Sequence, residues 1–426
     1  MASIKASTEG LKLIKAARER ITGETGWAID DPRWLEAASK FLPPVSFGGK
    51  LVPGTTSVGT WKRFLRGTPI KEATFRAFCQ LLELDFDRVV SPTPDARIQD
   101  FYVSRNAIEA QCYKMLLQPD CMLRIKASQR MGKTSLVDRV LNRVAIEDRY
   151  KTVRVSFKLA ERRDLANIDD LLEWICVEVG EQLELPPQFD RYWDEDVLNS
   201  KMNCTNYFER YLLTEIDAPL ALCLDDVDLL FAYPNICADF FPLLRFWNEK
   251  RNPPWHKLRL AIVYSTQIYI ELDIDRSPFN IGKLIELPEL TLPEIKQLAT
   301  LHDFDLEDDR ISQLMQLLGG HPDRWRQAIS ELKSRTDLTL NEFIDSAPTD
   351  VGIYSTHLRE QLYILQQNPI LSEAFKQILL AQTPVKLDTL TLYKLESLGL
   401  VKRVRGEAIV SCDLYRLYFQ SRLGEL

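Results

Sequence analysis

The chain has 426 residues and a formal net charge of −7, with 45% hydrophobic and 27% charged residues. At roughly 150 residues per domain, this length predicts two to four domains, each large enough for its own core. The composition argues against a disordered or membrane-embedded protein, and the negative balance argues against a surface that coats nucleic acid over its whole extent.

Charge and cysteine usage add expectations about partners and location. Residues 1–90 contain 14 Lys and Arg against 10 Asp and Glu, a net of +4, so the remaining residues carry −11. A site for a polyanion is therefore expected toward the N-terminus. The eight cysteines are scattered without a C-x-x-C pair, which is typical of a reducing cytoplasm. Because no apolar run reaches about 18 residues and no signal-peptide block follows Met1, we expect a cytoplasmic protein without a membrane partner.

The first 90 residues are predicted to be helical. Apolar residues repeat at helical spacing over residues 7–20, and Gly23 is expected to close that helix. Further helices are predicted at residues 32–41 and 72–82. Residues 55–67 and the helix that follows at 72–82 together resemble a helix-turn-helix of the repressor type. In that motif a Ser- or Thr-capped recognition helix ends at a glycine, and a further amphipathic helix buttresses it.

This resemblance suggests residues that could touch DNA. Trp61, Phe64 and Leu65 would form the core of the motif. The candidates for contacts with phosphates or base edges are Ser57, Thr60, Lys62, Arg63 and Arg66. A helical protein-interaction module with solvated basic residues is an equally open interpretation. A net charge of +4 supports only modest, salt-sensitive affinity for duplex DNA.

After a Pro-rich linker, residues 121–136 hold the stretch around which the chain is organised. Compared with the phosphate-loop pattern G-x-x-x-x-G-K-[ST], the chain has Gly132-Lys133-Thr134 but Ala127 at the first glycine. Backbone N–H groups would wrap the β-phosphate, Lys133 would neutralise phosphate oxygens and Thr134 would bind Mg²⁺. The predicted phosphate-binding residues are Gln129, Arg130, Met131, Gly132, Lys133, Thr134 and Ser135. A basic surface loop that caps a helix is the alternative.

Alternating strands and helices follow this loop. A helix is predicted at residues 133–144, a strand at 150–158, and helices at 168–183 and 206–214. Such alternation predicts an α/β fold with a parallel sheet covered on both faces.

Two later strands end in polar residues. The apolar run at residues 219–224 stops at Asp225-Asp226, as in a Walker B strand, so we expect Asp225 to hold Mg²⁺ through water and Asp226 to polarise the attacking water. A solvated acidic turn is the other interpretation. The strand at residues 258–264 is followed by Ser265-Thr266-Gln267, and Thr266 is favoured as the sensor of the γ-phosphate.

With these motifs, the chain from about Phe101 onward resembles the AAA-like, STAND-type P-loop ATPases of bacteria, relatives of archaeal and origin-recognition ATPases. The resemblance implies that Tyr102, Val103 and Pro322 lie near the adenine base, since Gly320-His321-Pro322 is similar to the G-x-P motif of the lid. It also implies a lid arginine, Arg324 or Arg326, and offers Arg276 as a finger toward a neighbouring subunit.

The same resemblance implies a domain order. We expect a helix-turn-helix-like all-α domain at residues 1–90, a linker at 91–100, a P-loop ATPase core at 101–290, a helical lid at 291–347 and a winged helix at 348–426. The C-terminal sequence supports the last of these, because a helical face at 387–398, a stop at Gly399 and a hairpin pattern at 401–411 succeed one another. Lys402, Arg403 and Arg405 would make a basic wing.

The predicted function is an ATP-dependent molecular switch. ATP, with Mg²⁺, would order the lid and winged helix and expose a surface for self-association or for a protein partner, and slow hydrolysis to ADP would reset it. The alternative is a DNA-binding ATPase that acts as a regulator or loader. A third candidate is a scaffold that binds ATP without turning it over.

Overall fold

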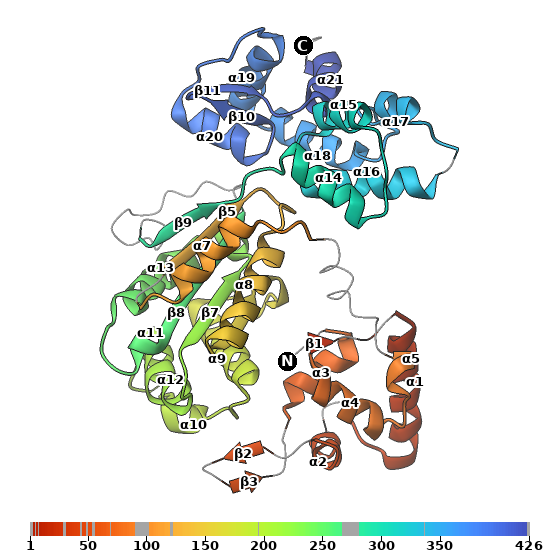
Figure 1. Cartoon of the computed structure of the whole chain (residues 1–426). Coiled ribbons are helices and arrows are strands. Elements are labelled where there is room, and N and C mark those ends of the chain that lie inside the picture. The colour runs from red at the N-terminus through yellow and green to blue at the C-terminus, as the bar shows by residue number, and fades with distance from the viewer. Residues whose placement is uncertain are drawn as a thin grey trace. The chain divides into compact units, whose positions relative to one another are not determined.

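A computed structural model gives the architecture of the chain (Figure 1). It describes residues 3–4, 6, 8–28, 31–42, 45–47, 50–52, 56–68, 70–89, 102–119, 122–194, 196–265, 281–335 and 337–423. The chain divides into two compact units, Met1–Phe101 and Tyr102–Leu426.

The N-terminal unit is built around a cluster of aromatic rings. Its helices are α1 (Thr8–Thr25), α2 (Arg33–Ser39), α3 (Val58–Arg66), α4 (Glu72–Leu81) and α5 (Phe86–Val89). The Trp34 and Trp61 rings stack at 5.1 Å, and Phe64 packs on Trp61 at 5.7 Å. Helix α1 runs past Gly23, where we expected it to stop, because the chain turns at Gly26 instead, with a φ of 70°.

The N-terminal unit also contains strands, which the all-α prediction missed. β1 (Ser3–Ile4) pairs antiparallel with β4 (Ile70–Lys71), and β2 (Val45–Phe47) pairs antiparallel with β3 (Lys50–Val52). The two-residue spacing between β2 and β3, filled by Gly48-Gly49, is the hairpin signal that could have found the second pair.

Helix α3 has the ends that the sequence predicts. The Ser57 hydroxyl accepts a hydrogen bond from the backbone N–H of Thr60 at 3.0 Å, and Gly67 closes the helix with a φ of 71°. A Cβ at Gly67 would also come within 3.0 Å of the Leu11 side chain, so both the backbone angle and the packing favour glycine there.

The C-terminal unit holds a five-stranded parallel sheet, which confirms the predicted α/β fold with a parallel sheet. The strand order is β6-β7-β8-β5-β9. Their bounds are β5 (Met122–Ala127), β6 (Lys151–Ser156), β7 (Leu220–Asp225), β8 (Leu258–Ser265) and β9 (Lys283–Glu286). Ala127 pairs with Ser265, and Ser156 pairs with Asp225. The carboxyl ends of four strands therefore meet at one edge of the sheet, and three of them, those of β6, β7 and β8, end in a polar residue.

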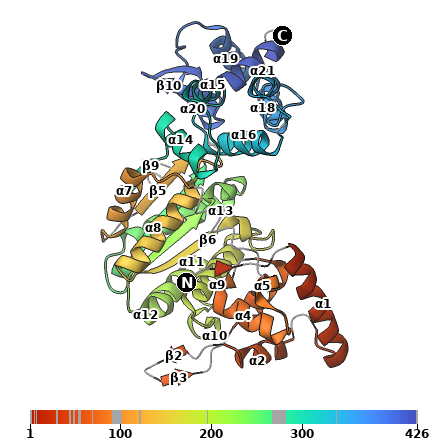
Figure 2. The same cartoon turned by 45° about the vertical axis from the view of Figure 1, so that its right-hand side comes forward.

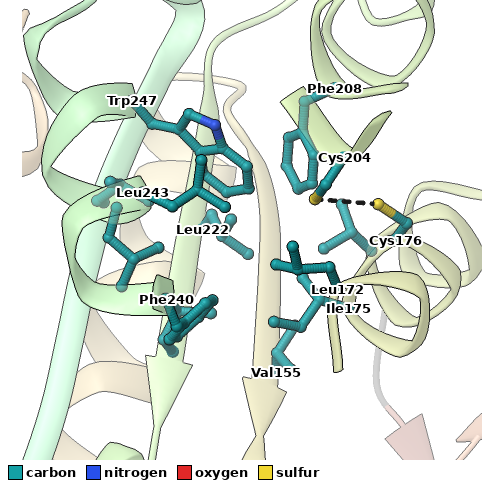
Figure 3. Close-up of a cluster of buried hydrophobic side chains, with 14 of the residues drawn as sticks. Val155, Leu172, Ile175, Cys176, Cys204, Phe208, Leu222, Phe240, Leu243 and Trp247 are labelled. Carbon is teal, nitrogen blue, oxygen red and sulfur yellow. Dashed lines mark hydrogen bonds between the residues drawn. The ribbon is translucent and has the colours of Figure 1, made fainter. Parts of the chain in front are cut away.

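Side-chain alternation along the strands divides the sheet into two apolar faces. On β7, Leu220, Leu222 and Leu224 belong to one buried cluster, whereas Ala221 and Cys223 belong to another. Helices α7 (Asn106–Leu116) and α8 (Lys133–Glu147) contribute to the second cluster. Helices α9 (Ile168–Leu183), α11 (Ser200–Tyr207) and α13 (Pro234–Glu249) contribute to the first, part of which Figure 3 draws. The ribbons of these helices are seen in Figure 2. The predicted two-sided covering is confirmed.

Two helical segments differ from the sequence prediction. The helix expected at residues 206–214 begins at Ser200, where Asn199 caps it, and continues as a π-helical turn (Phe208–Leu212) and α12 (Leu213–Glu215). Helix α13 was not predicted, because Pro242 lies inside it and proline usually breaks a helix. Its buried side chains, among them Phe240 and Trp247, pack against the sheet (Figure 3).

The remaining elements form one further helical body with a small hairpin. Four helices occupy the predicted lid, namely α14 (Leu292–Leu301), α15 (Asp308–Leu318), α16 (Pro322–Ser334) and α17 (Leu340–Ser346). They are followed by α18 (Ser355–Gln366), α19 (Pro369–Leu380), α20 (Thr389–Ser397), β10 (Val401–Val404), β11 (Glu407–Val410) and α21 (Asp413–Leu423). One hydrophobic cluster joins all of these elements and includes Val103.

Short elements also lie between the strands of the parallel sheet. They are α10 (Phe189–Tyr192) and the 3₁₀ turns Phe157–Leu159, Val227–Ala232 and Trp255–Lys257. Among the described residues, none of the helices combines the length and the apolar character needed to span a bilayer.

Candidate nucleotide-binding site

The phosphate loop accommodates Ala127 without strain. Ala127 is the last residue of β5 and has strand geometry. The positive φ angles of the loop fall later, at Arg130 (57°) and at Gly132 (90°), which is the N-cap of α8. Because only positions with positive φ strongly favour glycine, alanine at 127 fits the observed backbone, and the side chain of Met131 anchors the loop in the core.

The Lys133 ammonium group bonds to the phosphate loop and to the end of β8. Its Nζ donates to the carbonyls of Ala127 (3.1 Å) and Ser128 (2.8 Å) and to the Ser265 hydroxyl (2.9 Å). Burial lowers the pKa of Lys133, and the carboxylates of Asp228, Asp225 and Asp226 oppose that shift. A phosphate oxygen could replace these neutral acceptors and would give the lysine a charged partner.

A hydroxyl and a carboxylate meet where Mg²⁺ is expected. The Thr134 hydroxyl donates to Asp225 Oδ2 at 3.0 Å. The side chain of Asp225 is 1% exposed, and burial, followed by the charge of Asp226, raises the pKa of Asp225. Oxygen donors of these two kinds are the ligands that Mg²⁺ prefers, so the side chains present fit this ion.

Asp226 is held by the last residue of β6 and by a lysine of the 3₁₀ turn that follows it. Its Oδ2 accepts from the Ser156 hydroxyl at 3.0 Å, and its Oδ1 accepts from Lys158 Nζ at 2.6 Å. The backbone of Asp226 is left-handed, with a φ of 60°. The sequence does not single out Ser156 and Lys158, because only the position of β6 beside β7 brings them to Asp226, and strand order is not encoded locally.

The polar end of β8 contributes Ser265 to the site. Besides contacting Lys133, Ser265 donates its backbone N–H to Asp228 Oδ1 at 2.8 Å. Thr266, which we favoured as the sensor, lies outside the described residues, as does Arg276. The sensor role of Thr266 therefore stays a prediction, and Ser265 and Asp228 are additional polar residues of this edge.

Residues that begin α16 contact the phosphate loop. His321 Nε2 lies 3.1 Å from the Gln129 carbonyl, and Arg130 Nη1 lies 3.2 Å from Asp323 Oδ2. Burial, followed by the charge of Arg324, lowers the pKa of His321 to about 3. Pro322 is the first residue of α16, between these two contacts.

Glycine is required before this histidine. A Cβ at Gly320 would lie 2.1 Å from the carbonyl oxygen of Leu290, and the backbone of Gly320 donates to Glu289 Oε2 at 3.1 Å. Lys402 of β10 bonds to the same carboxylate at 2.6 Å. The junction between Glu289, Gly320 and β10 is therefore closely packed, and Lys402, which the sequence predicts as part of a basic wing, is engaged within the chain.

Three other predicted nucleotide contacts lie at this junction or near it. Val103 is buried in the hydrophobic cluster that joins the elements from α14 to α21. The Arg139 guanidinium lies 4.6 Å from the centre of the Tyr102 ring. Arg324 is 6% exposed and donates to the Leu318 carbonyl and to Cys412 Sγ. These bonds hold Arg324 within the helical body, and its role toward the nucleotide stays a prediction, like those of Tyr102 and Val103.

The DNA-binding candidates lie on one helix of the N-terminal unit. Ser57 is committed to the N-cap of α3 and also contacts the Thr60 hydroxyl at 3.1 Å. Arg66 is exposed, whereas Lys62 and Arg63 are partly buried. Their role in DNA binding stays a prediction.

Part of the chain is similar in sequence to a curated protein. Over 90 residues, the chain is 42% identical to an uncharacterized WD repeat-containing protein of Nostoc sp.. That match covers 21% of this chain and 7% of the relative, so the chain spans only a small part of that protein's length.

One solved structure shows similarity of fold. A Walker-type ATPase of Pyrococcus abyssi superposes with a TM-score of 0.53 at 12% identity, over 75% of this chain and 96% of that one. The ORC2 protein of Aeropyrum pernix, in ADPNP and ADP complexes, gives a TM-score of 0.44 at 17% identity, over 75% and 93%. The profile of the AAA-like domain family matches residues 93–421. The chain therefore belongs to the AAA-like domain family.

Proposed function

We propose that this protein binds ATP with Mg²⁺, hydrolyses it slowly to ADP and acts as a STAND-type molecular switch. The convergence of Lys133, Thr134 and Asp225 at one edge of the sheet is the observation that carries nucleotide binding. In this proposal, residues 101–290 are the ATPase core, 291–347 the lid and 348–426 a winged helix.

Each polar side chain has a defined task when nucleotide binds. Lys133 leaves the carbonyls of Ala127 and Ser128 for the β- and γ-phosphate oxygens, and backbone N–H groups from Gln129 to Ser135 face the β-phosphate. Thr134 and Asp225 would hold Mg²⁺, which supplies charge neutralisation to the phosphates when bound. Asp226 orients and polarises the attacking water once it is released from Lys158.

The proposed switch rests on two contacts that the phosphate loop makes with residues at the start of α16. Gln129 and Arg130, which belong to the phosphate-binding loop, bond to His321 and Asp323 of the lid. Binding of ATP cannot reshape the loop without changing these bonds, so the lid and winged helix would adjust with it. We infer that this adjustment orders the lid against the nucleotide and exposes a surface for self-association or for a protein partner.

Calorimetric titration with ATP in MgCl₂ tests the proposal. Wild type and Lys151→Ala, which changes an exposed lysine at the start of β6, should bind ATP, and Lys133→Ala should not. At a ligand concentration near a thousand times Kd, ATP should stabilise the wild type by about 4 kcal/mol. The absence of ATP binding to the wild type would refute the proposal.

Release of phosphate distinguishes the switch from a scaffold. Asp226→Asn should keep ATP binding and lose turnover, because it removes the carboxylate that polarises water. If the wild type binds ATP but releases no phosphate, and Asp226→Asn behaves identically, the scaffold interpretation is the better one.

DNA binding remains a second candidate because α3 combines a Ser N-cap, a glycine stop and basic residues. Full-length protein would be titrated with duplex DNA at several salt concentrations. The Lys62→Ala/Arg66→Ala variant should lose affinity, whereas Lys12→Ala/Lys15→Ala, a matched change on the exposed side of α1, should lose less. If no binding of duplex DNA that weakens with salt is measured up to about 150 mM salt, this candidate is rejected.

A further inference from the structure

Arg154 lies beside the expected metal site without a role in the mechanism above. Its Nη1 donates to Asp225 Oδ2 at 3.1 Å, the same oxygen that accepts the Thr134 hydroxyl. Its Nε lies 3.0 Å from Asp138 Oδ1 on α8. One guanidinium therefore bridges the Walker B strand and the helix that follows the phosphate loop.

The backbone at Arg154 is fixed by a second helix. The Gln182 side chain of α9 accepts from the Arg154 N–H and donates to its carbonyl, both at 3.0 Å. Since β6 is an edge strand of this sheet, these bonds replace the missing neighbouring strand. The guanidinium is thus presented toward the two carboxylates from a rigid position.

The two carboxylates differ in their need for a cation. The side chain of Asp225 is 1% exposed, whereas that of Asp138 is 38% exposed. A buried carboxylate requires a compensating charge much more than a solvated one does. Without Mg²⁺, Arg154 supplies that charge to Asp225.

We propose that Arg154 is a built-in competitor of the divalent cation, which bonds to both Asp225 and Asp138 in the metal-free state and keeps only Asp138 as its partner when Mg²⁺ arrives. The inference rests on the proposed function, because it concerns the Mg²⁺ of the same nucleotide site. Arg154 is a positioning residue here: it touches neither phosphate nor metal, and it sets the affinity for the metal through Asp225. Its repulsion of a divalent cation raises the metal concentration that the site needs.

Two variants should change metal affinity in opposite directions. Arg154→Gln removes the competing charge, so the complex with ATP should bind Mn²⁺ about fivefold more tightly. Asp138→Asn removes the alternative partner and leaves Arg154 on Asp225, so the affinity for Mn²⁺ should fall by about twofold. In the double variant, Asp138→Asn should have little further effect, because it acts through Arg154.

The test is a Mn²⁺ titration of full-length protein with ATP, in which electron paramagnetic resonance reports free Mn²⁺. Arg245→Gln, which breaks an ion pair with Glu249 on α13, is the matched control and should leave the affinity unchanged. If the arginine only tied α8 to β7, both variants would weaken metal binding alike, and that result would overturn the inference. Equal Mn²⁺ affinity in wild type and Arg154→Gln would overturn it too. A wild type that binds no ATP by calorimetry would instead refute the proposed function.

Discussion

The phosphate-loop edge of the sheet and the lid junction around Arg324 both hold charged side chains among buried residues, but their partners differ. At the sheet edge, Lys133 is bonded to neutral groups, and Asp226 is bonded to Lys158, which is 66% exposed. At the junction, Arg324 donates to Leu318 and Cys412 inside the core and also forms an ion pair with Glu289, at 4.0 Å. Charges at the first region can exchange partners when a ligand binds, whereas those at the second hold the fold together.

The largest effect is expected at the junction. Arg324→Met should lower the free energy of unfolding of the C-terminal unit by about 2–3 kcal/mol, because it leaves the buried Leu318 carbonyl without this donor. Chemical denaturation measures the loss, and Arg326→Met on the same helix, at an exposed position, is the control. A loss of ATP affinity without a loss of stability would favour the lid-arginine role that the sequence predicts.

Acid should weaken the contact between the lid and the loop. Burial lowers the pKa of His321 to about 3 and that of His357 to about 4, in each case with a contribution from Arg324. Both histidines are neutral in this conformation, whereas an exposed histidine takes up a proton below about pH 6.5. Stability is therefore constant above that pH and falls by up to about 1.4 kcal/mol per pH unit per histidine below it.

The measurement is the melting temperature between pH 7.5 and 5.5. His321→Gln keeps an N–H donor for the Gln129 carbonyl and should reduce the pH dependence without removing it, because burial also lowers the pKa of His357 and of His302. An identical pH profile in this variant would show that His321 does not carry the effect.

The smallest effect is expected where Lys158 holds Asp226. Lys158→Ala removes a partly exposed ion pair, so stability should change by less than about 1 kcal/mol. Release of the carboxylate should raise the rate of phosphate release by up to about fivefold. Unchanged or slower turnover, with ATP binding intact, would show that this ion pair does not restrain Asp226.

The site could be predicted from the sequence only where its residues are adjacent in the chain or end a strand. Lys133 and Thr134 follow from loop spacing, and Asp225 follows from an apolar run that stops at two acids. Ser156 and Arg154 could not be found this way, because their importance depends on β6 lying beside β7, and strand order is not encoded locally.

The fold, too, could be predicted only where the signal is local in the sequence. The parallel sheet and most helices follow from periodicity and from capping residues such as Ser57. Helix α13 was missed because Pro242 is tolerated within a helix whose apolar face is buried, so tertiary packing outweighed local propensity. The position of Arg324 depends on Cys412, which is 88 residues away in the sequence, and local patterns cannot place it.

Hydrogen–deuterium exchange with and without ATP tests the central claim most directly. Two peptides report on it, residues 126–136 of the phosphate loop and residues 319–326 of the lid. We predict that ATP with Mg²⁺ slows exchange in both peptides of the wild type and changes neither in Lys133→Ala. If calorimetry shows that ATP binds while exchange at residues 319–326 is unchanged, nucleotide does not control the lid and the switch is contradicted.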